Sequence, residues 1–239
     1  MTLLEHLAEL RRRLVISVIA VTIGTLLAFF VYNNVIHFID HPYRAFALKH
    51  PTKVIGQGQL VVTGPLEGFS TRLKVSAYLG IFLSSPVLFW ELWRFITPGL
   101  HRHEKKYAIS FVVSSVVLFT MGVTVSILVW PKALEFLINI GGNNIATLFG
   151  PQKYVNLYVA ACAIFGIVFL FPVVLVFLEI SGVVPSAKLR KWRRPAIVGI
   201  AFLATVATPS NDPYSFVAMA VPLYIFYEAS IILGRILGK

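Results

Sequence analysis

The sequence has 239 residues, of which 57% are hydrophobic and 13% charged, and its mean hydropathy is +0.81. Soluble domains carry roughly 25% charged residues, so this composition excludes a soluble globular protein and predicts an integral membrane protein. The net charge of +11 would suit a nucleic-acid-binding protein, but we expect no nucleic acid as a partner because the basic residues follow membrane topology.

Six apolar segments predict an all-α polytopic membrane protein that forms a single membrane domain over residues 1–239. The expected spans cover residues 14–36, 73–95, 107–130, 155–178, 195–207 and 214–233. Crossing the hydrocarbon core takes about 20 helical residues, so the segment 195–207 is short. It is flanked by LRKWRR and TPSNDP, which favours a short span around which the bilayer thins.

Lys and Arg residues set the orientation of the spans. With the N-terminus in the cytoplasm, 14 of the 21 Lys and Arg residues lie in the inner segments. Both termini are therefore predicted to be cytoplasmic, and the long outer loops cover residues 37–72 and 131–154. Pro86, Pro172 and Pro222 interrupt three spans, which predicts bent helices packed around a concave surface.

Acidic residues near the membrane are the first place to look for function, because an intramembrane charge is costly. Glu9 precedes Arg13 by four residues, and Leu3, Leu7, Leu10 and Leu14 share a helical face. This pattern predicts an amphipathic helix that continues into the first span. On spacing alone, Glu9 and Arg13 form an ordinary helical ion pair worth about 0.3–0.5 kcal/mol.

A second acid, Glu104, lies in the short inner turn FITPGLHRHEKKYAI. Pro98 ends one helix and the next begins near His103, so Glu104 falls in a first helical turn, where its charge favours the helix dipole. His101 and His103 are two residues apart without a third ligand nearby, so we expect neither a metal site nor a cofactor.

A third acid, Glu228, lies inside the last span toward its cytosolic end, where pairing with Arg235 at the lipid interface would explain it. The sequence contains no HExxH or GxSxG motif and no pair of mid-membrane aspartates. We therefore do not expect an enzyme.

Six stretches carry a resemblance that covers essentially the whole chain. In chain order they are HLAELRRRL, HPYRAF, GPLEGFSTRLKVS, SSPVLFWELWRFITPGLHRHEKK, ATPSNDPYS and VPLYIFYEAS. They resemble the TatC family, the signal-peptide receptor subunits of the twin-arginine protein translocase. The resemblance implies six spans with a short final helix pair and a receptor for signal peptides that bear two consecutive arginines. It also implies small single-span partners of the TatA and TatB type, an oligomeric complex, and export of folded proteins driven by the proton-motive force across the cytoplasmic membrane.

The resemblance also implies which residues act. The family acids that bind the arginine pair correspond to Glu9 and Glu104, and an aromatic position of the fourth stretch that is tied to function corresponds to Phe95. The remaining candidates are His6, Leu7 and Arg11 for the peptide, and Pro42, Glu67, Asp212 and Glu228 for other functions. Two positions before Pro172 the family usually has an acid that meets a partner helix, whereas this chain has Leu170.

Two other functions stay open from the residues themselves. A polytopic transporter of small solutes would need facing polar residues at mid-membrane, and the sequence offers few beyond Ser114, Ser115, Asn156 and Thr205. A membrane scaffold would need none.

Overall fold

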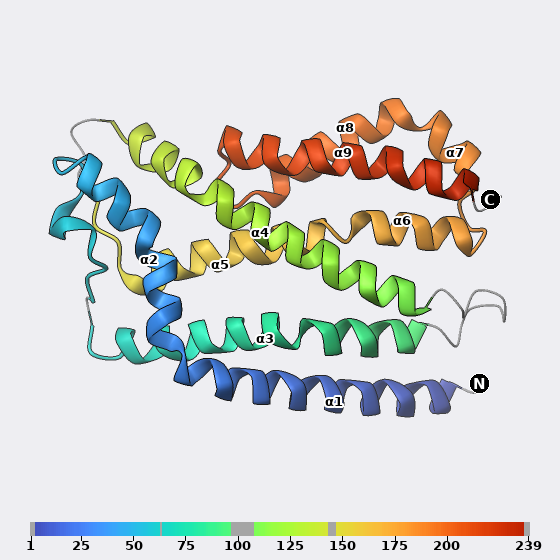
Figure 1. The fold of residues 1–239 in the computed structure, drawn as a ribbon, viewed down its shortest axis with the longest axis horizontal. Helices are drawn as coiled ribbons and strands as arrows, with labels where there is room; N and C mark the ends of the chain where they lie inside the picture. Colours follow the sequence, from blue (N-terminus) through green and yellow to red (C-terminus); the bar gives the residue numbers. More distant parts are fainter. Residues whose placement is uncertain (1–2, 63, 97–107, 143–146, 237–239) are drawn as a thin grey trace. The chain divides into compact units, whose positions relative to one another are not determined.

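The computed structural model describes residues 3–62, 64–96, 108–142 and 147–236. Its helices are α1 (Leu3–Phe30), α2 (Tyr32–Lys49), η1 (Ile55–Gly58), α3 (Glu67–Ile96), α4 (Ala108–Ile140), α5 (Pro151–Val168), α6 (Phe171–Ile180), α7 (Ser186–Lys191), α8 (Arg193–Ala207) and α9 (Pro213–Ile236). Within these ranges the only strand-like pairing is an isolated parallel bridge between Val54 and Thr147. The predicted all-α polytopic fold is confirmed, because helices occupy all six apolar segments (Figure 1).

Five stretches of helix are long and apolar enough to cross a membrane by length and composition. They are His6–Phe30, Glu67–Ile96, Ala108–Ile140, Pro151–Ile180 and Pro213–Ile236. The protein is therefore a multi-pass membrane protein. Helix α8, with 15 residues, is the short element expected at 195–207, and its crossing of the bilayer stays a prediction.

The predicted outer loops are partly helical. Helix α1 ends at Phe30 and α2 begins at Tyr32, so the first helix stops short of the predicted residue 36. The chain turns at Val31, whose amide donates to the carbonyl of Ala28 over 3.2 Å. Tyr32, Asn33 and Asn34 follow this turn, and the predicted span ran through these polar residues to residue 36. Helix α4 likewise runs through Pro131 to Ile140, beyond the predicted end at residue 130.

The fourth predicted span, 155–178, consists of two helices. Helix α5 ends at Val168 and α6 starts at Phe171, with Pro172 in the first turn of α6. Proline has no amide hydrogen to donate, so it is tolerated at a helix start and breaks a helix interior. The predicted bend at Pro172 is therefore a break, whereas α3 and α9 continue through Pro86 and Pro222.

The chain forms two compact units, which we describe separately. Unit 1 comprises Met1–Ile36 and Phe69–Val117, and unit 2 comprises His37–Gly68 and Leu118–Lys239. That residues 1–239 act as a single membrane domain stays a prediction.

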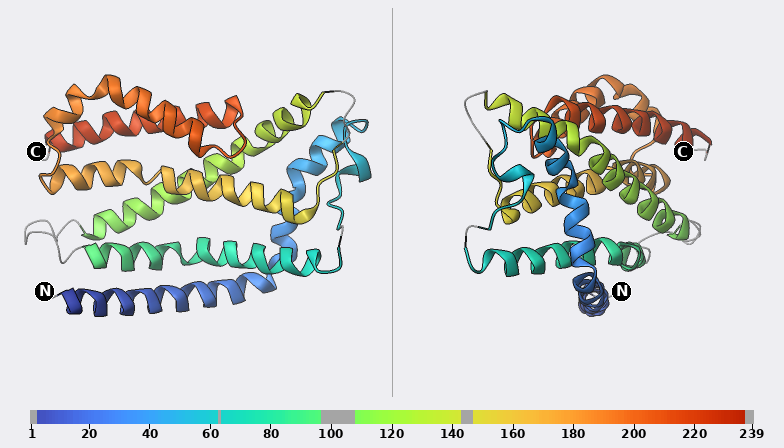
Figure 2. Two further views of the ribbon diagram at one scale, coloured as in Figure 1. Left: turned by 180° about the vertical axis from the view of Figure 1, so that it is seen from behind. Right: turned by 60° about the vertical axis from the view of Figure 1, so that its left-hand side comes forward.

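In unit 1, α1 and α3 run side by side (Figures 1 and 2). A Cβ atom added to Gly24 would lie 2.7 Å from the carbonyl oxygen of Gly80, so the two backbones meet where neither residue has a side chain. The Ser84 hydroxyl donates to the carbonyl of Ala20 over 2.8 Å. Small residues and interhelical hydrogen bonds of this kind hold membrane helices together, because lipid supplies no hydrophobic drive between them.

In unit 2, α9 packs on α6 and α8. One buried hydrophobic cluster of this unit consists of Phe165, Phe169, Leu175, Leu189, Ile200, Ala204, Met219, Leu223, Tyr227 and Ile231. A Cβ on Gly122 of α4 would lie 2.5 Å from the carbonyl oxygen of Phe165, so α4 and α5 also approach closely through a glycine.

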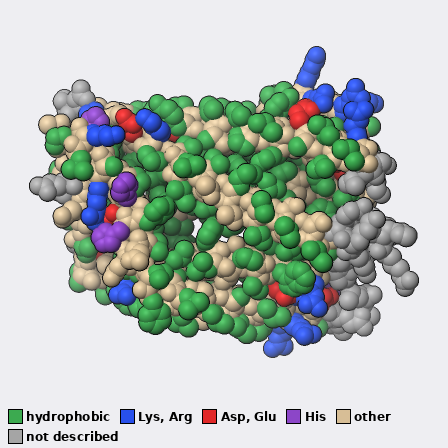
Figure 3. Space-filling model, in the orientation of Figure 1, with side chains coloured by type: hydrophobic (Ala, Val, Ile, Leu, Met, Phe, Trp, Pro, Cys, Tyr) green, Lys and Arg blue, Asp and Glu red, His purple; other side chains and the backbone are tan. Residues whose placement is uncertain are grey.

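Many large apolar side chains are exposed on the helices, which suits contact with lipid. On the face drawn in Figure 3 the Lys, Arg, Asp and Glu side chains lie toward the ends of the helices. Leu14, Leu26 and Phe30 of α1 are among the strongly exposed apolar residues.

Candidate functional site

Glu9 belongs to a three-residue charge cluster that joins α1 to α3. The guanidinium of Arg13 donates from Nη2 to Glu9 Oε1 over 2.7 Å and from Nη1 to Glu91 Oε2 over 2.9 Å. The expected helical ion pair between Glu9 and Arg13 is therefore present, and a third residue, from α3, completes it. Arg13 bridges two carboxylates 82 positions apart in the sequence, residues 9 and 91.

The cluster is sheltered from solvent. The side chains of Glu9, Arg13 and Glu91 are 17%, 16% and 8% exposed. Charge-assisted hydrogen bonds are about twice as strong as neutral ones, and removing one partner of a buried pair costs about 3–5 kcal/mol. The cluster is thus worth more than the surface pair that the spacing alone indicates.

The hydrogen bonding of the cluster is incomplete. Glu9 Oε2 and Arg13 Nε are buried and have no hydrogen-bond partner among the described residues. With two carboxylates and one guanidinium, the three side chains carry a net charge of −1. The cluster can therefore accept one further cationic donor.

Next to the cluster the structure brings His6 and Phe95 together. Their rings stack with centroids 4.5 Å apart and planes inclined by 23°. Residue 6 lies one turn before Glu9 on α1, and residue 95 lies one turn after Glu91 on α3. Two candidates from different motifs are therefore in contact beside the same charge cluster.

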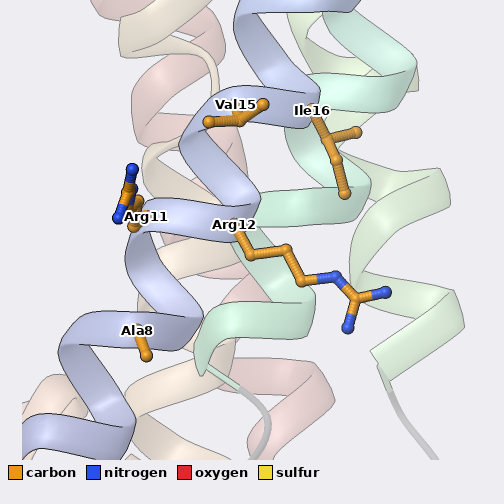
Figure 4. Close-up of a pocket in the computed structure, with 5 residues that line it drawn as sticks. All are labelled: Ala8, Arg11, Arg12, Val15 and Ile16. Carbon is orange, nitrogen blue, oxygen red and sulfur yellow. The ribbon is translucent and has the colours of Figure 1, made fainter.

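Leu7 and Arg11 lie on exposed parts of α1. Arg11 also lines an open hollow of about 610 Å³ with Ala8, Arg12, Val15 and Ile16, all from α1 (Figure 4). Arg11 and Arg12 extend from α1 in different directions. Since one helix alone lines this hollow, it is a depression on the helix surface and forms no enclosed binding site.

Glu104, the other predicted arginine-binding acid, lies outside the described residues, as do His101 and His103. Elsewhere in the chain, the described residues contain no group of three or more His, Cys, Asp or Glu side chains that could hold a metal ion.

Glu91 was missed by the sequence reasoning although a signal was available. It is an acid within the apolar run SSPVLFWELWRF of the second predicted span, and an ionisable residue in a span is by default a candidate for function. Its partner Arg13 could not be read from the sequence, because the two residues meet only through tertiary packing.

Pro42 and Glu67 lie on the side of the predicted outer loops. Pro42 is inside α2, next to Tyr43, whose hydroxyl donates to the carbonyl of Thr147 over 3.3 Å. Burial raises the pKa of the Tyr43 hydroxyl above its ordinary value, which keeps it a hydrogen-bond donor. Glu67 begins α3, and a Cβ on Gly150 would lie 2.8 Å from its carboxylate.

Asp212 is buried and caps the start of α9. Its Oδ1 accepts the amide of Ser215 over 2.8 Å, and its Oδ2 accepts the hydroxyl of Ser210. N-cap carboxylates satisfy amides that have no partner within the helix. The structure therefore gives this candidate a structural task in the turn between α8 and α9.

Glu228 pairs with Arg193 and not with Arg235, so the expected pairing is wrong. Arg193 Nη2 donates to Glu228 Oε2 over 2.6 Å, and Arg193 is the first residue of α8. The contact arises because α8 packs on α9, which brings a helix start next to a residue 35 positions later in the sequence.

Leu170 lies between α5 and α6 and is half-buried. Its carbonyl accepts the amides of Val173 and Val174 over 3.0 and 3.2 Å, so the first turn of α6 closes although Pro172 has no amide to donate. The position usually occupied by an acid in the resembling family is therefore at a helix break.

Comparisons with known proteins agree with this description. Residues 5–222 match the family model described as Sec-independent protein translocase protein (TatC). The chain is 36% identical to the TatC protein of Magnetococcus marinus, covering 98% of this chain and 83% of the relative. It is 36% identical to that of Frankia casuarinae, covering 98% of this chain and 65% of the longer relative.

A solved structure has the same fold over its full length. The crystal structure of the twin arginine translocase receptor TatC superimposes with a TM-score of 0.74 at 32% identity, covering 98% of this chain and 100% of the solved chain. The helical fold, the matched residues and the identity over nearly the whole length lead to one conclusion: the chain belongs to the TatC family of Sec-independent protein translocase proteins.

Proposed function

We propose that this protein is the signal-peptide receptor subunit of a twin-arginine translocation system in the cytoplasmic membrane. It binds the twin-arginine signal peptides of folded precursors at its cytosolic face, where both termini lie. With single-span subunits of the TatA and TatB type, in an oligomeric complex, it exports these precursors using the proton-motive force. Membership in the TatC family supports the system, and the likeness to a solved translocase receptor supports the role within it.

The proposal depends most on the surroundings of the Glu9 carboxylate. Its carboxylate is largely sheltered from water, and one of its oxygens has no partner among the described residues. A buried acceptor without a partner costs about 1–3 kcal/mol, which an incoming guanidinium would recover. The stacked rings of His6 and Phe95 add an apolar surface beside it.

The chemistry favours arginine over lysine. A guanidinium is planar, always charged and able to bind a carboxylate through two parallel hydrogen bonds, whereas an ammonium is a compact point charge. Glu9 and Glu104 together would recognise two consecutive arginines while the apolar stretch of the peptide lies along the spans. Leu7 and Arg11, exposed on α1, would contact the peptide next to Glu9.

The experiment is peptide binding by the full chain in lipid nanodiscs. A fluorescent peptide with Arg-Arg before an apolar stretch should bind more tightly than the same peptide with Lys-Lys. Glu9→Ala and Glu104→Ala should each weaken arginine-peptide binding by about 1–3 kcal/mol, the range for a lost charged hydrogen-bond partner.

The matched control is Glu135→Ala, because Glu135 forms an exposed ion pair with Lys132 at 3.4 Å. Equal binding of both peptides, or an equal loss in all three variants, would contradict the proposed receptor function. It would favour a small-solute transporter or a scaffold instead.

Orientation is tested separately. We expect a cysteine placed in the turn after Ala207 to react with a membrane-impermeant reagent from outside the cell, in a background where Cys162 is replaced by alanine. Labelling from the cytoplasmic side would remove α8 as a span and contradict the predicted topology.

A further inference from the structure

Arg13 already occupies part of the Glu9 carboxylate. It lies 2.7 Å from Glu9 Oε1, so a peptide arginine that binds Glu9 through both oxygens must compete with it. Releasing Arg13 altogether would leave a guanidinium with 16% side-chain exposure and no counter-ion, which is strongly unfavourable.

Glu91 removes this obstacle. Its carboxylate holds the other terminal nitrogen of Arg13 at 2.9 Å and is itself 8% exposed. Arg13 can therefore stay paired with Glu91 when Glu9 turns toward another cation. The charge balance agrees, because two carboxylates and two guanidinium groups, one of them from the peptide, are neutral.

The basic neighbours do not perform this role. Arg11 and Arg12 are exposed and extend away from the helix in other directions (Figure 4). No ion pair joins either of them to Glu9 or Glu91 in the described part of the chain. Glu91 is thus the described acid placed to share Arg13 with Glu9.

We propose that Glu91 is a positioning residue that determines arginine specificity. By holding Arg13 while Glu9 binds the peptide, it lets the Glu9 carboxylate accept a peptide guanidinium through both oxygens. This inference rests on the proposed receptor function, and it adds Glu91, an acid of the fourth TatC-like stretch, to the peptide site.

The test compares binding of the Arg-Arg and Lys-Lys peptides to the full chain in nanodiscs for five proteins. They are the wild type, Glu9→Gln, Glu91→Gln, the double variant Arg13→Gln with Glu91→Gln, and the control Glu135→Gln. We expect Glu91→Gln to weaken Arg-Arg binding about tenfold, the value of one charge-assisted hydrogen bond. The preference for Arg-Arg over Lys-Lys should fall with it.

The double variant distinguishes positioning from a purely structural role. It removes Arg13 together with its counter-ion, so Glu9 is free and the net charge of −1 returns. We expect it to bind the Arg-Arg peptide within about threefold of the wild type, because coupled partners are not additive. If Glu91 only supported the fold, the double variant would bind no better than Glu91→Gln.

The outcomes also separate this inference from the receptor function. A wild type that binds both peptides equally would overturn the receptor function itself. A wild type that prefers Arg-Arg, loses the preference in Glu9→Gln and keeps it in Glu91→Gln would overturn the role of Glu91 alone. Loss of the preference in Glu135→Gln would also overturn it, since the effect would then not belong to the cluster.

Discussion

Two buried glutamates, one in each unit, have opposite surroundings. Glu91 of α3 is 6% exposed and receives a guanidinium hydrogen bond from Arg13 at 2.9 Å. Glu179 of α6 is fully buried, and neither of its carboxylate oxygens has a hydrogen-bond partner among the described residues. The Glu91 carboxylate in unit 1 therefore has a hydrogen-bond partner, whereas the described residues give the Glu179 carboxylate in unit 2 none.

Gly234 leaves room for the buried carboxylate of Glu179. A Cβ on Gly234 of α9 would collide with the carboxylate of Glu179, so the carboxylate lies in the space that a side chain would otherwise fill. The nearby Tyr227 hydroxyl donates to the carbonyl of Leu189 over 2.7 Å and is used there. Burial of a carboxylate alone therefore does not identify a binding site. The residue that pairs with the carboxylate must also be known.

The largest effect is expected from removing the shared guanidinium. Arg13→Leu leaves the carboxylates of Glu9 and Glu91 without a counter-ion, and breaking a buried pair costs about 3–5 kcal/mol. The free energy of unfolding in denaturant, measured on the full chain in detergent micelles, reports this loss. Arg235→Leu is the matched control, because Arg235 is exposed on α9. A loss no larger than that of the control would show that the cluster contributes little to stability.

A smaller loss is expected from filling the space beside Glu179. Gly234→Ala places a methyl group against the buried carboxylate, and overpacking of this kind costs about 1–3 kcal/mol. Gly199→Ala is the control, since its Cβ position has no atom within 4 Å apart from its chain neighbours and the adjacent backbone of its own helix, and there alanine should favour the helix. Adding Glu179→Ala to Gly234→Ala should restore stability, and failure to restore it would mean that the clash lies elsewhere.

The sequence predicts contacts within one helix better than contacts between helices. The helices follow from hydropathy, and the pair of Glu9 with Arg13 follows from a spacing of four residues. Helix α2 could also have been predicted from the sequence, because its buried residues Ile39, Tyr43, Phe46 and Ala47 recur at helical spacing.

What could not be predicted depends on which helices pack together. Glu91 meets Arg13 across 78 positions and Glu228 meets Arg193 across 35. No local pattern encodes either pairing. The sequence did carry a signal for the turn at Val31, because Tyr32, Asn33 and Asn34 follow it, but the predicted span ran through them to residue 36.

Substitution at residue 170 can place an additional carboxylate in unit 2. Leu170→Glu puts an acid at the half-buried break between α5 and α6, where we expect a polar residue of a single-span partner to meet it. Interhelical hydrogen bonds in membranes contribute about 0.6 kcal/mol, up to about 1.7, so association with the partner should strengthen by that amount. Co-purification of the partner measures the change, and peptide binding in the same variant should be unaltered. Weaker peptide binding would mean that recognition and assembly are coupled.

The smallest effect on stability is expected at Glu179, because substitution there removes no hydrogen bond to a described residue. Glu179→Gln keeps the shape of the side chain, and the described residues offer its carboxylate no hydrogen bond that the substitution would remove. The free energy of unfolding should change by less than about 0.5 kcal/mol, below the net value of a single hydrogen bond. Glu91→Gln, measured in the same micelles, should cost about 1.5–3 kcal/mol, because it weakens a hydrogen bond between charged groups. If the two variants lost equal stability, Glu179 would have a cationic partner of its own, and the contrast between the two buried glutamates would disappear.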